Sequence, residues 1–134
     1  MRKFTLELIP VPDAVTSYFK LHIDNKCPIE DFWNEIEKAG NHAHELDVIQ
    51  TVIERLAQRK PVSPNRFKEL KHRSKKDDYK DYEIRTKHLR VYLFEDEETG
   101  KIIVLGARKD PKKQKRDIAR MRGIKLEYFE SKNP

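Results

Sequence analysis

The beginning of the chain alternates between hydrophobic and polar residues with the period of a β-strand. Two such segments occur, and their hydrophobic positions are Phe4, Leu6 and Leu8 in the first and Phe19, Leu21 and Ile23 in the second. A period of two places these side chains on one face of each strand. Prolines at positions 10 and 12 separate the segments, so residues 3–24 are predicted to form a β-hairpin. A short helix beginning at Asp13 is the alternative.

Two segments with helical periodicity follow. Their hydrophobic positions are Ile29, Phe32, Trp33 and Ile36 in the first and Leu46, Ile49, Ile53 and Leu56 in the second. Spacings of three and four residues place each set on one face of a helix. Pro28 suits the first position of a helix, Gly40 its C-terminal end, and Asn41 the N-cap of the next helix, which Pro61 stops. The pattern predicts a helical hairpin with a short link.

The remainder of the chain is typical of strands followed by one helix. The strand-like segments are 67–71, 82–85, 89–94 and 101–107. The last of them is a continuous apolar run, which is typical of a central strand. Pro111 is predicted to begin a final helix that ends near Met121, with Gly123 as its stop, whereas residues 124–134 have no predicted structure. The fold class is α+β, in a single domain over residues 1–134.

Composition adds limits to this picture. A chain of 134 residues is too short for two independent cores. Its single cysteine, Cys27, excludes an intramolecular disulfide and suits a reducing compartment. The N-terminus lacks the apolar stretch of a signal peptide, and no run approaches the length of a membrane span. We therefore expect a cytoplasmic protein without a membrane partner.

Charge is distributed unevenly along the chain. Residues 1–65 hold 8 Lys and Arg against 10 Asp and Glu, a net charge of −2, whereas residues 66–134 hold 21 against 13, a net charge of +8. Together these give the net charge of +6 for the whole chain. Solubility alone does not require such an uneven distribution of charge, whereas a surface that binds phosphate groups needs an excess of cations. The basic half is therefore expected to bind a polyanion.

Four motifs follow one another in the basic half, and their order carries a family resemblance. They are Arg66-Phe67-Lys68-Glu69-Leu70-Lys71, Tyr82-Glu83-Ile84-Arg85, Leu89-Arg90-Val91-Tyr92-Leu93-Phe94, and Lys101-Ile102-Ile103-Val104-Leu105-Gly106 before a basic run. With the helical hairpin, the block from about Cys27 to Met121 resembles the RelE-like toxins of type II toxin–antitoxin modules, closest to their HigB-type and phage-associated branch. The resemblance implies a RelE-like fold, in which the helical hairpin packs on a small antiparallel sheet with a short C-terminal helix. The N-terminal strand would be an addition.

The resemblance also implies an activity and partners. Toxins of this type cleave mRNA, usually on the ribosome, and a separate antitoxin protein neutralises them. The 2′-hydroxyl of RNA attacks the neighbouring phosphorus, and fixed cations can stabilise the charge of the transition state without a metal. Arginine suits this role because its guanidinium group matches pairs of phosphate oxygens. No cofactor is therefore expected.

The same resemblance assigns roles to four residues. Arg90 and Arg108 correspond to the family's two arginines that stabilise the scissile phosphate, and Arg85 to a basic position that grips or activates the nucleophile. Glu83 stands where some members have a basic residue, and its carboxylate is a candidate general base. The period of two places Glu83 and Arg85 on one face of a strand. Solvated arginines and a surface ion pair are the structural alternatives.

The sequence departs from the family pattern after the second arginine. The family often has a tyrosine or histidine there as the general acid, whereas this chain continues with Asp110 and Pro111. Tyr128 and Lys112 are alternative proton donors, and neither is favoured. Because proton transfer contributes about 10²–10⁴ in rate, the departure also admits an inactive relative.

Further residues are candidates for binding RNA. They are the cations Lys71, Arg73, Lys109, Lys112 and Lys113, together with Tyr92. Cations around the last helix can contact phosphates or an acidic antitoxin, and a tyrosine can stack on bases or cover the sheet. No metal site is predicted, because the histidines and Cys27 lack the ligand spacing of a zinc site.

Three functions remain open at this point. The first is an RNase toxin, which Arg85, Arg90 and Arg108 favour. The second is a non-enzymatic protein of the same fold, either a ParE-like gyrase inhibitor or an inactive nucleic-acid-binding relative, which the missing acid favours. The third is a basic RNA-binding adaptor outside the family.

Overall fold

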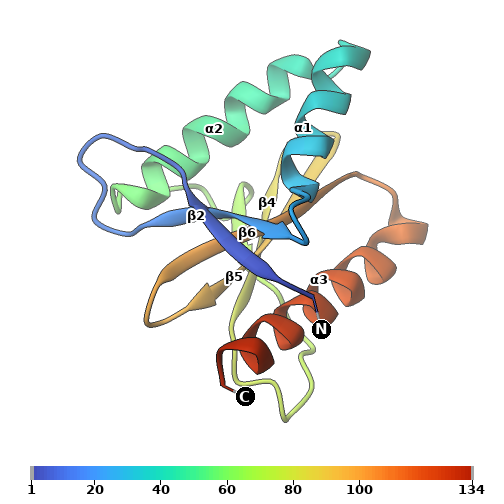
Figure 1. Ribbon diagram of the computed structural model, residues 1–134. Coiled ribbons are helices and arrows are strands. Elements are labelled where there is room, and N and C mark those ends of the chain that lie inside the picture. Colours follow the sequence, from blue (N-terminus) through green and yellow to red (C-terminus); the bar gives the residue numbers. More distant parts are fainter. Residues whose placement is uncertain (1, 134) are drawn as a thin grey trace.

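A six-stranded sheet runs through the middle of the molecule, with two helices on one face and one on the other (Figure 1). The computed structural model describes residues 2–133. The strands are β1 (Phe4–Leu8), β2 (Tyr18–Ile23), β3 (Phe67–Glu69), β4 (Asp81–Arg85), β5 (Leu89–Asp96) and β6 (Gly100–Arg108), in the spatial order β1-β2-β6-β5-β4-β3. The helices are α1 (Pro28–Ala39), α2 (Ala43–Ala57) and α3 (Pro111–Lys132). The predicted α+β class is confirmed.

The N-terminal hairpin forms as predicted, but it changes the character of the sheet. Strands β1 and β2 pair antiparallel, with Leu6 opposite Leu21, and no helix begins at Asp13. Strand β2 then pairs in parallel with β6, where Phe19 lies opposite Ile102. The sheet is therefore mixed: the predicted antiparallel sheet corresponds to β3–β6, and the N-terminal hairpin adds a parallel pair to it. A parallel pair needs a long crossover, and the chain between β2 and β6, which begins with the helical hairpin, provides it.

Helices α1 and α2 cover one face of the sheet. Ile36 and Ile49 are fully buried against residues of the strands such as Val91. Gly40 ends α1 with a positive φ of 83°, which glycine adopts without steric cost. The N-cap of α2 is His42 and not Asn41 as predicted, and its side chain makes no capping hydrogen bond.

Helix α3 is longer than predicted and covers the opposite face. It continues through Gly123 to Lys132, so the prediction of a short helix ending near Met121 is wrong. Its second half buries Ile124, Tyr128 and Phe129 against the sheet, where Phe94 packs against the last two rings. This burial stabilises a segment whose charged composition obscures the helical pattern. None of the helices among residues 2–133 is both long and apolar enough to cross a lipid bilayer.

Replacing Gly123 with alanine is expected to raise the free energy of unfolding by about 0.5–1 kcal/mol. The glycine lies inside a regular helix, and a Cβ atom placed on it would meet no atom within 4 Å. Equilibrium urea unfolding measures the change. The control is Gly40→Ala, which should destabilise the protein because of the positive φ at that position. A loss of stability in Gly123→Ala would contradict the helical assignment.

Candidate nucleic-acid interface

The three arginines singled out in the sequence lie at one end of the sheet. Arg85 on β4 lies opposite Arg90 on β5, and Arg108 on β6 lies opposite Leu89 on β5. The ends of β4 and β6 and the start of β5 therefore meet there. Their side chains nevertheless leave different faces. Arg85 and Arg90 point to the α3 side, whereas Arg108 lies near Glu35 of α1, at 3.7 Å. The expected single cluster of three arginines does not form.

A β-bulge in β6 accounts for the position of Arg108. The pairing of β5 with β6 shifts between Tyr92 and Leu93, which lie opposite Leu105 and Ile103, so that Val104 is an extra residue. Val104 and Leu105 therefore both face α3, and the side chains after Leu105 alternate out of phase with those before Val104. Without the bulge, strict alternation would direct Arg108 to the α3 face beside Arg90.

Glu83 and Arg90 belong to a buried ion-pair group on the α3 face. The Glu83 side chain is fully buried, with its Oε1 atom 3.0 Å from Arg85 Nε and 3.6 Å from Arg90 Nε. Gln114 of α3 donates a hydrogen bond to Glu83 Oε2 at 3.3 Å. The pairing of Glu83 with Arg85 on one strand face confirms the prediction of their common direction.

Arg90 braces the turn between β4 and β5. Its Nη1 atom donates to the carbonyl oxygens of Thr86 at 2.6 Å and Leu89 at 2.8 Å. Burial, together with the nearby charge of Arg85, lowers the pKa of Arg90. The side chain of Arg85, in contrast, is 34% exposed. Arg85 is therefore the arginine of this face that a solvent-borne ligand can reach.

Exposed and half-exposed cations gather at the same end of the sheet, and three of them line a hollow. We call this surface the basic end, defined by Arg85, Lys87, Arg108, Lys109, Lys112 and Lys113. An open hollow of about 620 Å³ lies at the end of β6, where Arg108, Lys109, Lys113 and Arg116 contribute to its wall. Figure 1 places the end of β6 and the start of α3 on the right of the molecule. The basic end thus presents both strand and helix cations to solvent.

The remaining predicted RNA-binding residues lie elsewhere or are covered. Lys71 and Arg73 follow β3, beside the start of β4 and away from the basic end. Tyr92 is buried beneath α3, and burial raises the pKa of its hydroxyl. The prediction that Tyr92 stacks on bases does not fit this position, because no face of its ring is free.

The two alternative proton donors also lie far apart. Tyr128 donates a hydrogen bond to Asp96 at 2.8 Å, at the β5–β6 turn, which is the opposite end of β5 from Arg90. Tyr128 therefore does not return to the arginines. Lys112 is exposed on the first turn of α3, at the basic end.

A histidine–glutamate group at the basic end was missed by the sequence analysis. Glu45, on the first turn of α2, is only 3% exposed. It accepts hydrogen bonds from the Thr86 hydroxyl and from the His88 backbone N–H, at 2.8 Å for the latter, and its Oε2 lies 2.6 Å from His88 Nδ1. The ring of His42 stacks on that of His88, with centroids 4.1 Å apart. No local sequence pattern predicts this group, because the fold brings together segments that are distant in the sequence.

The pKa of Glu45 reflects these contacts. Burial alone would raise it, but the hydrogen bonds from Thr86 and His88 outweigh burial and lower the pKa to about 2. Glu45 is therefore ionised at neutral pH. A buried negative charge is held directly behind an imidazole ring whose side chain is 43% exposed.

The same group is a poor fit for a metal ion. Donor atoms of His42, Glu45 and His88 lie within 4.8 Å of one another, but the two rings are stacked with planes only 20° apart. The lone pairs of imidazole nitrogens lie in the ring plane, so those of two stacked rings do not converge on one point. A shared ion would require the rings to separate and turn.

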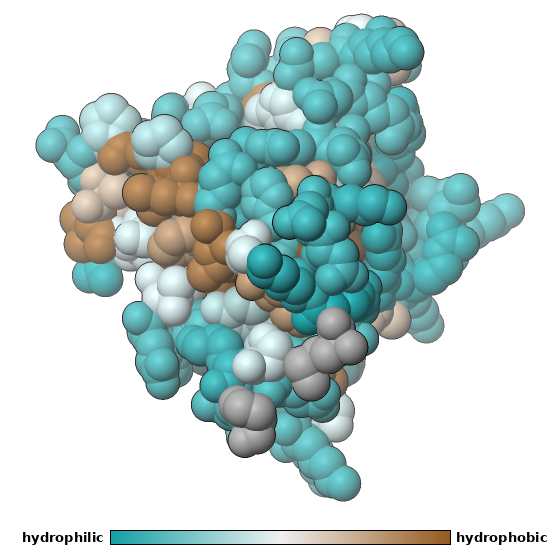
Figure 2. Space-filling model, viewed as in Figure 1, coloured by the Kyte–Doolittle hydropathy of each residue, from teal (hydrophilic) through white to brown (hydrophobic). Residues whose placement is uncertain are grey.

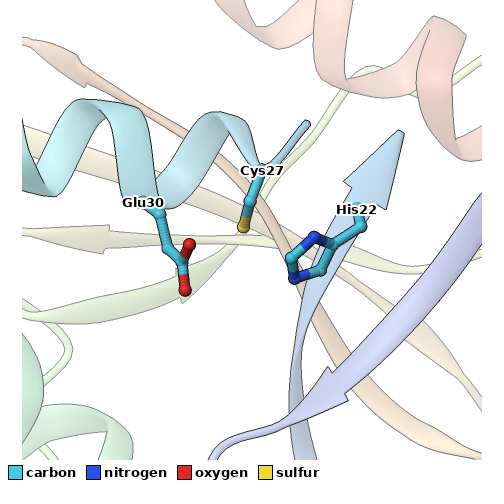
Figure 3. Close-up of side chains that lie close together, drawn as sticks. All are labelled: His22, Cys27 and Glu30. Carbon is cyan, nitrogen blue, oxygen red and sulfur yellow. The ribbon is translucent and has the colours of Figure 1, made fainter. Parts of the chain in front are cut away.

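A second group of possible metal ligands lies near the start of α1 (Figure 3). His22, Cys27 and Glu30 offer a nitrogen, a sulfur and an oxygen atom within 4.8 Å of one another. Glu7 already contacts His22 Nε2 at 2.7 Å, and Lys20 donates to Glu30 at 3.1 Å. Burial raises the pKa of the Cys27 thiol, which disfavours the thiolate that binds metals. The group is therefore satisfied by protein partners as it stands.

An apolar surface lies away from the basic end. Figure 2 shows hydrophobic side chains gathered on the left of the molecule, where Figure 1 places the β1–β2 connection. Leu8 and Val15 are exposed there, and a hollow of about 520 Å³ nearby is lined in part by Ile9 and Trp33. Its apolar lining does not suit a polyanion.

Comparisons of the chain with protein-family models, with curated proteins and with solved structures gave no match.

Proposed function

We propose that this protein is a RelE-type toxin that cleaves mRNA, acting with the ribosome in the cytoplasm and neutralised by a separate antitoxin protein. The element order supports this proposal. From β2 to β6 the chain forms a strand, a helical hairpin and further strands, the order that the motifs imply, and the antiparallel β4, β5 and β6 are sequential. The hairpin β1–β2 and the long α3 extend this arrangement at both ends.

The observation that carries the proposal is the basic end. Three of its cations line the hollow at the end of β6, together with Arg116 and three acidic residues. Within residues 2–133, the exposed Glu35 is the only ion-pair partner of Arg108, at 3.7 Å. An exposed pair of this kind contributes little stability, so Arg108 can exchange the carboxylate for a phosphate at low cost. An arginine beside several lysines is well suited to an RNA backbone.

The geometry changes the predicted roles of the four candidate catalytic residues. We assign phosphate contact to Arg108 and to the accessible Arg85. Arg90 holds the β4–β5 turn through two carbonyl oxygens, so its contribution is to position that turn. Glu83 is covered by Arg85 and Gln114 and orients Arg85, rather than accepting a proton from RNA.

A non-enzymatic protein of the same fold is the second candidate. Arg85 and Arg108 leave opposite faces of the sheet, and Arg90 is buried against Glu83. A basic surface without convergent arginines favours binding without cleavage, as in a ParE-like gyrase inhibitor or an inactive relative.

Induction of the protein in a bacterial host tests the proposal. The wild-type chain is expected to arrest growth and to cut mRNA within translated regions, mapped by primer extension. Arg108→Ala is expected to lower the cleavage rate about 10²–10³-fold, because it removes one fixed charge from the transition state. The matched control is Arg2→Ala, which removes the same charge from a residue paired with Glu127.

Two results would contradict the proposal. Growth arrest with intact mRNA and stalled replication would support the gyrase candidate instead. Unchanged mRNA cleavage by the Arg108→Ala variant would remove the basic end from the cleavage site.

A further inference from the structure

His88 occupies a position from which it can reach an RNA bound at the basic end. It lies in the turn between β4 and β5, next to the strand residue that faces Arg108. The backbone N–H of Lys109 donates to the His88 carbonyl oxygen at 2.7 Å. The histidine is thus tied directly to the chain segment that carries two cations of the basic end.

The contacts of His88 are those of an oriented proton-transfer residue. The carboxylate of Glu45 lies 2.6 Å from Nδ1, which leaves Nε2 free of that contact on a half-exposed ring. A buried carboxylate behind one imidazole nitrogen fixes the ring and its tautomer while the other nitrogen exchanges a proton. The stacked ring of His42 limits rotation of the imidazole further.

The turn itself is held in place from both sides. The Thr86 hydroxyl donates to Glu45, and the Leu89 N–H donates to the oxygen of that hydroxyl at 3.1 Å. Arg90 donates to the carbonyl oxygens of the same two residues. Such bracing is what a group needs to act at a fixed distance from a reacting atom.

We infer that His88 is the general acid that the sequence pattern lacks, with Glu45 as its positioning residue; this rests on the proposed RNase function. In the reaction, the RNA 2′-oxygen forms a bond to phosphorus and the 2′-hydroxyl proton passes to solvent. The bond from phosphorus to the 5′-oxygen breaks, and protonated His88 gives its Nε2 proton to that oxygen. The products are a 2′,3′-cyclic phosphate and a 5′-hydroxyl end.

A leaving-group substitution tests this role. Synthetic mRNAs carry either the natural 5′-oxygen or a bridging 5′-sulfur at the mapped cleavage position, and are offered to the full-length protein on programmed ribosomes. His88→Gln is expected to cut the oxygen substrate about 10²–10⁴-fold more slowly than wild type. It should cut the sulfur substrate at nearly the wild-type rate, because a thiolate leaves without a proton.

The controls separate this role from a structural one. His44→Gln changes an exposed histidine of the same helix as Glu45 and should retain the wild-type rate. Glu45→Gln should slow cleavage of the oxygen substrate and be rescued by sulfur in the same way. Misfolding would slow the cleavage of both substrates equally. Circular dichroism therefore checks that each variant is folded.

The outcomes distinguish the two proposals. The assignment of His88 is overturned, and the RNase function stands, in either of two cases in which the wild-type protein cuts RNA. In the first, His88→Gln cuts the oxygen substrate at a rate within about threefold of the wild-type rate. In the second, the bridging sulfur does not restore the cleavage rate of His88→Gln. If the wild-type protein cuts neither substrate, the RNase function fails and the role of His88 fails with it.

Discussion

Lys125→Met is expected to lower the free energy of unfolding by about 3–5 kcal/mol, the cost of leaving buried charge unpaired. Lys125 lies in the middle of α3 and is fully buried. Its Nζ atom lies 2.7 Å from Asp77 and 2.8 Å from Asp81, and it donates to the Tyr79 carbonyl oxygen at 2.6 Å. Arg122 still pairs with Asp81 in the variant, so Asp77 is the carboxylate that loses its cationic partner. Equilibrium urea unfolding measures the loss.

Two further variants establish that the effect comes from the buried charges. Lys115→Met changes an exposed lysine of the same helix and should alter stability by no more than about 0.5 kcal/mol. Adding Asp77→Leu to Lys125→Met removes the unpaired carboxylate and should restore part of the lost free energy of unfolding. If Lys125→Met were as stable as the Lys115 variant, the ion-pair group would not hold α3 to the sheet.

The stability of the protein should fall in acid by an amount that depends on Glu45. The folded-state pKa of this residue is about 2, below the value of about 4.3 for an unfolded chain. Its ionised form therefore stabilises the fold at neutral pH, and this contribution disappears as the pH falls from about 5 to about 2. The shift corresponds to a stability on the order of 3 kcal/mol.

The measurement compares the free energy of unfolding of wild type and Glu45→Gln between pH 2 and pH 7. The variant should be less stable at neutral pH, and the difference should shrink toward pH 2. Glu37→Gln, at an exposed position on α1, serves as the control and should follow the wild-type curve. Parallel curves for wild type and Glu45→Gln would refute the proposed linkage.

Local patterns in the sequence were sufficient for most elements of the fold. Alternation identified the strands around Leu6 and Leu21, and the spacing of apolar residues identified α1 and α2, because both signals repeat within a few residues. Helix α3 was predicted too short, since its buried positions include Lys125, whose partners lie on β4 and the loop before it. In the sequence, a lysine that is buried among carboxylates looks the same as a lysine exposed to solvent, because its partners are set by the tertiary structure.

The candidate site was predictable only in part. The period of two of a β-strand predicted that Glu83 and Arg85 share one strand face, which the structure confirms. The direction of Arg108 depends on the bulge at Val104, and no residue pattern in β6 reveals an extra residue there. The contact of His88 with Glu45 depends on how α2 docks beside the β4–β5 turn, which is a property of the tertiary structure.

The bulge in β6 has a consequence for how related chains are compared. Two chains can carry the same arginine the same number of residues after the β5–β6 turn and yet direct it to opposite sides of the sheet, if the strand is bulged in only one of them. Aligned letters would then be identical while the chemical surroundings were exchanged. A cation can thus change sides of a sheet through the pairing of its strand, without any change of residue type.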